Sequence, residues 1–141
     1  METTTKKTIT VESTVNAPIE KVWDYWTKPE HITQWNNASD DWHTPWVKAD
    51  FREGGSFVAR MEAKDGSMGF DFGGVYDVLR LNEYIEYTIG DGRKVKISFA
   101  QQGNATKVTE NFEAETENSI ELQRGGWQAI LDNFKKYTEA N

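Results

Sequence analysis

Six short segments in which apolar and polar residues alternate occupy most of the chain between residues 44 and 114. Alternation with a period of two is typical of β-strands that have one buried face. The segments are residues 44–49, 56–63, 69–79, 84–89, 94–100 and 106–114. Glycine-rich turn signals separate several of them, among them Asp65-Gly66 and Gly103-Asn104. Short connections join antiparallel neighbours, so the sequence predicts an antiparallel meander.

Two further patterns flank these segments. Residues 8–15 alternate in the same way, and Pro18 then suits the first position of a short helix. Pro29 closes that helix and opens a second one, with Ile32 and Trp35 expected to be buried. The last pattern is one long amphipathic helix, which we expect to begin at Asn118 as its N-cap, with Glu121 at the capping-box position, and to end near residue 137.

A sheet of seven antiparallel strands with one apolar face needs a cover, and the terminal helix is the only predicted element large enough to supply it. We therefore predict an α+β, helix-grip fold, in which a curved seven-stranded antiparallel sheet wraps around a long C-terminal helix. Two short helices follow the first strand. Residues 1–141 are expected to form one such domain, and a cavity is expected between the sheet and the helix.

The composition bears on partners and location. The net charge is −7, and Lys and Arg are scattered among more numerous acids, so nucleic acid and anionic membrane surfaces are expected to be poor partners. No apolar run approaches the roughly 20 residues of a membrane helix. The start of the chain, residues 1–7, is polar, so we expect no signal peptide and a cytoplasmic location. We expect a monomer or a weak dimer.

A ligand site is predicted on the inward face of the sheet. Two tyrosines there bring hydroxyls that need partners when they are buried, and the small Ala59 and Gly74 leave space between large rings. Ordinary core packing is the alternative for each of these residues, and Trp35, Trp42 and Trp46 are about as well explained by packing beneath a loop. The candidate ligand-binding residues are Trp35, Trp42, Trp46, Phe57, Met61, Phe72, Tyr76, Tyr87, Phe99, Glu110, Gly126, Trp127, Ile130 and Leu131.

Glu110 is the most informative of these residues. It shares one face of the last strand with Val108 and Phe112, so it points inward if they do. Burial of a carboxylate is costly and raises its pKa. Glu110 is therefore either a polar anchor for a ligand or an acid/base group. The alternatives are a β-bulge that turns it outward or a hydrogen bond to a tyrosine.

Gly125 and Gly126 interrupt the terminal helix, where each costs roughly 1 kcal/mol relative to alanine. Two explanations remain open at this point. The missing side chains either let the helix approach the sheet closely or leave a hollow that roofs the cavity, and we favour the hollow.

The sequence contains little that indicates other chemistry. His31 and His43 are the only histidines and cysteine is absent, so we expect no metal site, even though Asp40 and Asp41 lie close to His43 in the chain. No phosphate loop, dinucleotide fingerprint or serine elbow occurs, so no cofactor is expected and nucleophilic catalysis is unsupported.

The ordered set of motifs resembles the START-related helix-grip superfamily (SRPBCC). It is most similar to the branch named for the C-terminal domain of the heat-shock-protein-90 ATPase activator. The matching stretches are APIEKVW with PEHITQW, FREGGSF, GGVYDV and GGWQAILDNF. The resemblance implies a hydrophobic ligand held between sheet and helix, and some members catalyse cyclisation, hydration or dehydration. The eukaryotic chaperone activators carry a further N-terminal domain, which we expect this chain to lack.

Three functions follow as expectations. The first is binding, without chemical change, of a small apolar molecule such as a lipid, a flavonoid or a polyketide-like compound. The second is a cyclase or hydratase that acts on aromatic or polyketide substrates and uses Glu110 as its general acid/base. The third is regulation of a chaperone ATPase, which needs no cavity and connects the chain to stress responses.

Overall fold

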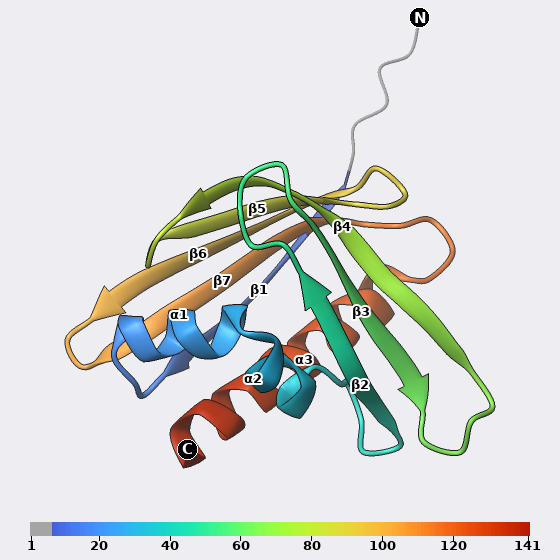
Figure 1. Ribbon diagram of the computed structural model, residues 1–141, viewed down its shortest axis with the longest axis horizontal. Coiled ribbons are helices and arrows are strands. Elements are labelled where there is room, and N and C mark those ends of the chain that lie inside the picture. Colours follow the sequence, from blue (N-terminus) through green and yellow to red (C-terminus); the bar gives the residue numbers. More distant parts are fainter. Residues whose placement is uncertain (1–6) are drawn as a thin grey trace, which may run out of the picture.

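One antiparallel sheet of seven strands curls around a long C-terminal helix in the computed structural model (Figure 1). The structure describes residues 7–141. Residues 1–6 lie outside this range, and they belong to the polar segment from which we expect no signal peptide. The strands are β1 (Thr8–Val15), β2 (Trp42–Ala49), β3 (Ser56–Ala63), β4 (Gly69–Arg80), β5 (Tyr84–Ile89), β6 (Lys94–Gln102) and β7 (Ala105–Glu113). The helices are α1 (Ile19–Thr27), α2 (Pro29–Trp35) and α3 (Ile120–Ala140).

The strand order is β1-β7-β6-β5-β4-β3-β2, so β2 to β7 follow one another across the sheet in sequence order and β1 pairs with the last strand. All six pairings are antiparallel. Helix α3 crosses the concave side of the sheet and packs against β1, while α1 and α2 lie beside the C-terminal part of α3 (Figure 1). The predicted helix-grip architecture is confirmed.

The helix starts differ from the expected ones by one residue. Ser119, not Asn118, caps α3, because the Ser119 hydroxyl accepts a hydrogen bond from the backbone N–H of Leu122 at 3.1 Å. Glu121 therefore stands one position too early for a capping box. Pro18 is the N-cap of α1 rather than its first helical residue. The last helix also extends beyond the predicted end, to Ala140.

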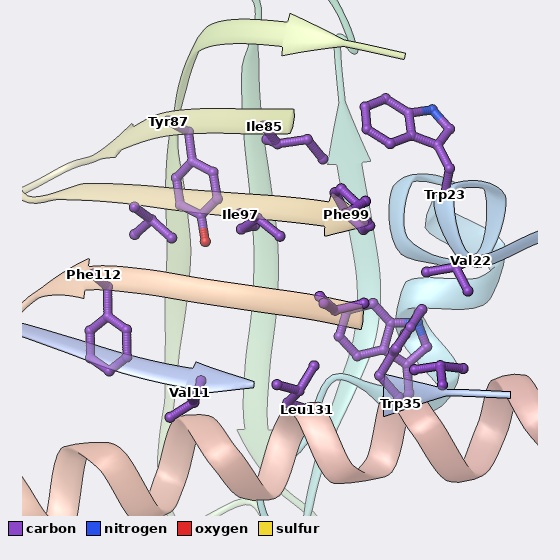
Figure 2. Packing of buried hydrophobic residues seen from close by; sticks show 14 of the residues in the cluster. Val11, Val22, Trp23, Trp35, Ile85, Tyr87, Ile97, Phe99, Phe112 and Leu131 are labelled. Atoms are coloured by element: carbon purple, nitrogen blue, oxygen red, sulfur yellow. The ribbon is translucent and has the colours of Figure 1, made fainter. Parts of the chain in front are cut away.

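The hydrophobic core lies between the concave face of the sheet and α3. Figure 2 shows side chains from adjacent strands, among them Val11, Ile97 and Phe112, directed toward the helix, from which Leu131 rises to meet them. Phe112 and Leu131 are both almost completely buried. The alternation read from the sequence therefore identifies the inward face of β1, β6 and β7.

A β-bulge in β4 breaks the alternation once. The register with β5 shifts between Tyr76 and Val78, so that Leu79, and not Val78, pairs with the inward Ile85. The loop between β2 and β3 packs against β4 at the bulge. The backbone N–H of Gly54 donates to the carbonyl of Tyr76, and the backbone N–H of Tyr76 donates to the carbonyl of Gly55. The bulge thus turns Tyr76 and Leu79 to the same side of the sheet.

No helix within residues 7–141 is both long enough and apolar enough to cross a membrane.

Candidate functional site: a cavity between the sheet and the helices

A cavity of about 380 Å³ lies between the concave face of the sheet and the three helices. Strands β2 to β5 and β7 form one wall, and side chains of α1, α2 and α3 form the opposite one. The lining residues are Trp26, Thr27, Ile32, Trp35, Asn36, Val47, Phe51, Phe57, Ala59, Met61, Phe70, Phe72, Tyr76, Ile85, Tyr87, Arg93, Glu110, Glu115, Asn118, Gln123, Trp127 and Ile130. The volume is within the range of small-molecule sites.

Contiguous aromatic rings form much of the lining. The ring of Phe57 lies 5.0 Å from that of Tyr76 and 4.9 Å from that of Tyr87 between centroids. Phe72 continues the series, with its centroid 6.5 Å from Tyr87 and 6.3 Å from Trp127. Trp127 is held from behind, because it stacks on the core residue Phe112 at 3.8 Å with an angle of 13° between the rings. The rings therefore form a fixed apolar wall.

Glu110 is the one carboxyl group of this wall that comes from the sheet. It lies in the middle of β7 between Val11 of β1 and Ile97 of β6, which are both buried, and is itself only 4% exposed. Within residues 7–141, no hydrogen bond or ion pair reaches its carboxyl group. Burial raises the pKa of Glu110 to about 8. A neutral carboxylic acid can both donate and accept a hydrogen bond.

Two tyrosine hydroxyls face the same space. Burial raises the pKa of Tyr76 to about 12. Burial first, and the nearby Glu110 second, raise the pKa of Tyr87 well above its ordinary value. Neither hydroxyl has a hydrogen-bond partner in the described part of the chain. The sheet thus presents three polar groups that a bound molecule can satisfy.

The remaining charged groups of the lining already have partners. The guanidinium of Arg93 binds the carboxylate of Asp91 at 2.8 Å and the backbone carbonyl of Glu113 at 3.3 Å. The carboxylate of Glu115 accepts the backbone N–H groups of Glu117 and Asn118 at 3.2 and 2.8 Å. Both groups stabilise turns, so the free carboxyl group of Glu110 dominates the polarity of the cavity.

Most of the predicted ligand-binding residues are brought together around this cavity. They are Trp35, Phe57, Met61, Phe72, Tyr76, Tyr87, Glu110, Trp127 and Ile130. Glu110 faces inward, and neither the bulge nor the tyrosine hydrogen bond considered from the sequence occurs there. That these residues bind a ligand stays a prediction.

Four other predicted residues lie elsewhere. Trp46 is 40% exposed on the outer face of β2, where the ammonium group of Lys48 lies 5.5 Å from its ring. Trp42 stands at the start of that strand beside Phe70, outside the cavity lining. Phe99 packs against helix α1, with its ring 5.3 Å from that of Trp23. Leu131 is fully buried in the core (Figure 2). None of these four side chains lines the cavity. The bulge in β2 and the docking of α1 set the positions of Trp46 and Phe99.

The structure removes one of the two explanations for the helix glycines and contradicts the expected space at Gly74. A Cβ atom added at Gly125 or Gly126 would meet nothing within 4 Å, so close helix–sheet packing does not explain either residue. Gly126 lies in the same helical stripe as Gln123 and Ile130 but does not itself line the cavity. Gly74 leaves no room for a ligand, because its missing Cβ would lie 2.2 Å from the carbonyl oxygen of Thr88.

Several lining residues were not among the predicted ones. Trp26 turns toward the cavity from α1, and Phe51 reaches the cavity from the loop before β3. Arg93 and Gln123 line the rim. The side-chain amide of Gln123 binds the carbonyls of Glu115 and Asn118 at 3.1 and 2.9 Å, and so closes the loop before α3. Local periodicity contains no signal for such tertiary contacts.

The histidines lie outside the cavity. His43 faces Glu62 across the β2–β3 pair at 3.6 Å, rather than Asp40 or Asp41. The ring of His31 stacks on Tyr25 at 3.9 Å, and its Nδ1 lies 2.8 Å from the hydroxyl of Tyr137. Within the described range, no three His, Asp or Glu side chains gather closely enough to hold a metal ion.

Comparison with known proteins agrees with this fold. The family model "Activator of Hsp90 ATPase homolog 1-like protein" matches residues 16–139, which is most of the chain. The chain belongs to this family. No curated protein sequence matches it significantly.

Solved structures extend the comparison within the AHSA1-like family and beyond it. An AHSA1-like protein from Aeromonas hydrophila is 43% identical with a TM-score of 0.89, covering 95% of this chain and 93% of its own. A protein from Cytophaga hutchinsonii is 58% identical with a TM-score of 0.82, covering 94% of this chain and 92% of its own. A protein from Chromobacterium violaceum has the same fold at 23% identity, with a TM-score of 0.83 and coverage of 96% and 99%.

Proposed function

We propose that this AHSA1-like protein binds a small, mainly apolar molecule in the cavity between the sheet and α3 and releases it unchanged. The ligand classes that fit are lipids, flavonoids and polyketide-like compounds. The observation that carries the proposal is the combination of an open space of about 380 Å³ with a wall of aromatic rings and three unpartnered polar groups. Membership of the helix-grip fold, which commonly holds hydrophobic ligands, supports it.

The ligand has a defined orientation in this proposal. The rings of Phe57, Phe72 and Trp127 supply contact area for its apolar body. The carboxyl group of Glu110 and the hydroxyls of Tyr76 and Tyr87 bind its polar end. Buried polar groups left unpaired are costly, so a ligand that satisfies them gains affinity and specificity.

Titration of intrinsic tryptophan fluorescence tests the proposal. Trp26, Trp35 and Trp127 line the cavity and report on its occupancy. A panel of fatty acids, flavonoids, sterols and aromatic polyketides is expected to give a saturable change with one chemical class. A folded protein that responds neither to this panel nor to the three phenylalkyl probes described below would contradict the proposal.

A cavity-filling variant shows whether such a response comes from the cavity. Ala59→Leu adds three carbon atoms from β3 into the open space and is expected to reduce affinity by about tenfold or more at little cost in stability. Val58→Leu enlarges the neighbouring side chain on the other face of the same strand and is the matched control. Equal affinities of the two variants would place the ligand elsewhere.

An enzymatic function is a second candidate, favoured by one observation. Glu110 holds a proton at neutral pH because its pKa is about 8, and it faces a space large enough for a substrate. It would act as the general acid/base of a cyclase or hydratase. This candidate predicts conversion of the bound compound and its loss in Glu110→Gln, whereas the binding function predicts recovery of the compound unchanged.

Regulation of a chaperone ATPase is the remaining candidate, and the description of the family supports it. It predicts that the protein stimulates the ATPase of a heat-shock protein in a purified mixture. Because it needs no cavity, Ala59→Leu is expected to leave that stimulation intact.

A further inference from the structure

The cavity combines an aromatic wall with one buried carboxyl group, and both features favour a positively charged ligand. The faces of aromatic rings carry negative partial charge and attract organic cations within about 6 Å of the ring centroid. Phe57, Phe72, Tyr76, Tyr87 and Trp127 form a continuous set of such rings along the lining. Glu110, 4% exposed and without a partner in residues 7–141, faces the same space.

We infer that the ligand of this cavity is an amphiphilic organic cation, an aromatic or alkyl body that carries an ammonium group, with the ammonium seated beside Glu110. The inference rests on the proposed binding function and specifies its ligand class. The apolar body lies against Phe57 and Phe72, and the ammonium group reaches the carboxylate on β7.

The other charge types fit this cavity less well. An anionic ligand would find no free cationic group in the lining, because the guanidinium of Arg93 is already bound to Asp91 and to the carbonyl of Glu113. A cation, in contrast, can pair with Glu110 once its carboxyl proton is released. A neutral ligand satisfies the hydroxyls of Tyr76 and Tyr87 but leaves the negative potential of the rings unused. The net charge of −7 also favours approach of a cation over approach of an anion.

Binding of an ammonium group is coupled to loss of a proton. The empty site holds Glu110 as the neutral acid at pH 7, and the cation binds its carboxylate, so the carboxyl proton leaves to water. The other ionisable groups of the lining do not take part. Tyr76 and Tyr87 stay neutral because burial raises the pKa of each, and Arg93 and Glu115 are held by their turns. Helix α3 and the strands beside β7 contribute only uncharged side chains here: Gln123, Trp127, Ile130, Val11 and Ile97.

Three probes that share a phenylalkyl body and differ in charge test the inference: phenylbutyl-trimethylammonium, phenylpentanol and phenylpentanoate. Fluorescence titration of the full chain at pH 8 is expected to show the cation binding about tenfold more tightly than the alcohol, and the carboxylate most weakly. Equal or tighter binding of the alcohol would overturn the inference and leave the proposed function standing. Binding of none of the three would overturn the inference, while the broader ligand panel decides the proposed function separately.

A charge-matched pair of variants assigns the preference to Glu110. Glu110→Gln is expected to abolish the preference for the cation and to retain the affinity for phenylpentanol. Glu12→Gln removes the same unit of charge from the exposed outer face of β1 and is expected to keep the preference. A preference that survives in Glu110→Gln would overturn the inference.

The pH dependence of ligand affinity in the wild-type protein tests the inference even if Glu110→Gln fails to fold. The affinity for phenylbutyl-trimethylammonium is expected to rise by roughly tenfold between pH 6 and pH 7, since each binding event releases one proton below the pKa of about 8. The affinity for phenylpentanol is expected to stay nearly constant over the same range. If the affinities of the two probes changed with pH in the same way, the position of the ammonium group beside Glu110 would be contradicted.

Discussion

Glu110 is a glutamate in the middle of a strand, buried between aliphatic neighbours and without a partner among the described residues. A fully apolar residue at this position would fit the surrounding core better, so the carboxyl group costs stability in the empty protein. Residues that break the local rules of packing in this way are expected at functional sites. The same reasoning applies to the unpartnered hydroxyls of Tyr76 and Tyr87.

The cost of Glu110 predicts how stability depends on pH. Its pKa rises from the ordinary value of 4.5 to about 8 in the folded protein. As the pH rises between these values, the unfolded chain releases a proton that the native state still holds, so the free energy of unfolding falls. Glu110→Gln has no such proton. Its stability relative to the wild type is therefore expected to increase by a few kcal/mol between pH 5 and pH 8.

Urea denaturation of both proteins at pH 5 and pH 8 measures this difference. Glu12→Gln, on the exposed face of β1, serves as the control and is expected to show no comparable change. A difference between wild type and Glu110→Gln that is the same at both pH values would mean that the carboxyl group is paired or solvated.

At the scale of the elements, alternation and helical spacing predicted every strand and helix, and most ends lie within two residues of the predicted ones. The predictions that were wrong concern features that depend on contacts between elements. The bulge after Tyr76 turns Leu79 inward, and local spacing does not reveal it. Asn118 and Ser119 are adjacent polar residues that can each cap a helix, and Ser119 is the N-cap of α3. Trp26 lines the cavity and Phe99 does not, because the docking of α1 and α2 sets both.

The glycines of α3 and β4 supply a matched pair of predictions at this scale. Gly125 is exposed in the helix and a Cβ there meets open space, so Gly125→Ala is expected to raise the free energy of unfolding by about 1 kcal/mol. At Gly74 a Cβ would lie 2.2 Å from the carbonyl oxygen of Thr88. Gly74→Ala is expected to lower stability by about 1–3 kcal/mol, as overpacking does.

Chemical denaturation of the two alanine variants in parallel tests the pair. A destabilised Gly125→Ala would show that this part of the helix needs the close approach that the structure does not have. A neutral Gly74→Ala would show that β4 and β5 can separate, and that the wall of the cavity is looser than described.

At the scale of the molecule, the sheet wraps around α3 without filling the space between them. The C-terminal half of the helix closes the core with Leu131 (Figure 2) and Phe134, while the half that begins near Gln123 lines the cavity. The C-terminal half of α3 therefore stabilises the fold through core packing, while the N-terminal half borders the cavity. The solved structures at 43% and 58% identity have the same fold along nearly their whole length.

The central claim is that a neutral, unpartnered carboxyl group lies in an open ligand cavity. NMR titration of the Glu110 side-chain carboxyl carbon tests it most directly, in the free protein and in the protein saturated with the ligand that the fluorescence panel identifies. The account predicts a pKa of about 8 in the free protein and a clear shift when the cavity is occupied. An ordinary pKa near 4.5 that the ligand does not change would contradict it, because the carboxyl group would then be solvated and apart from the site.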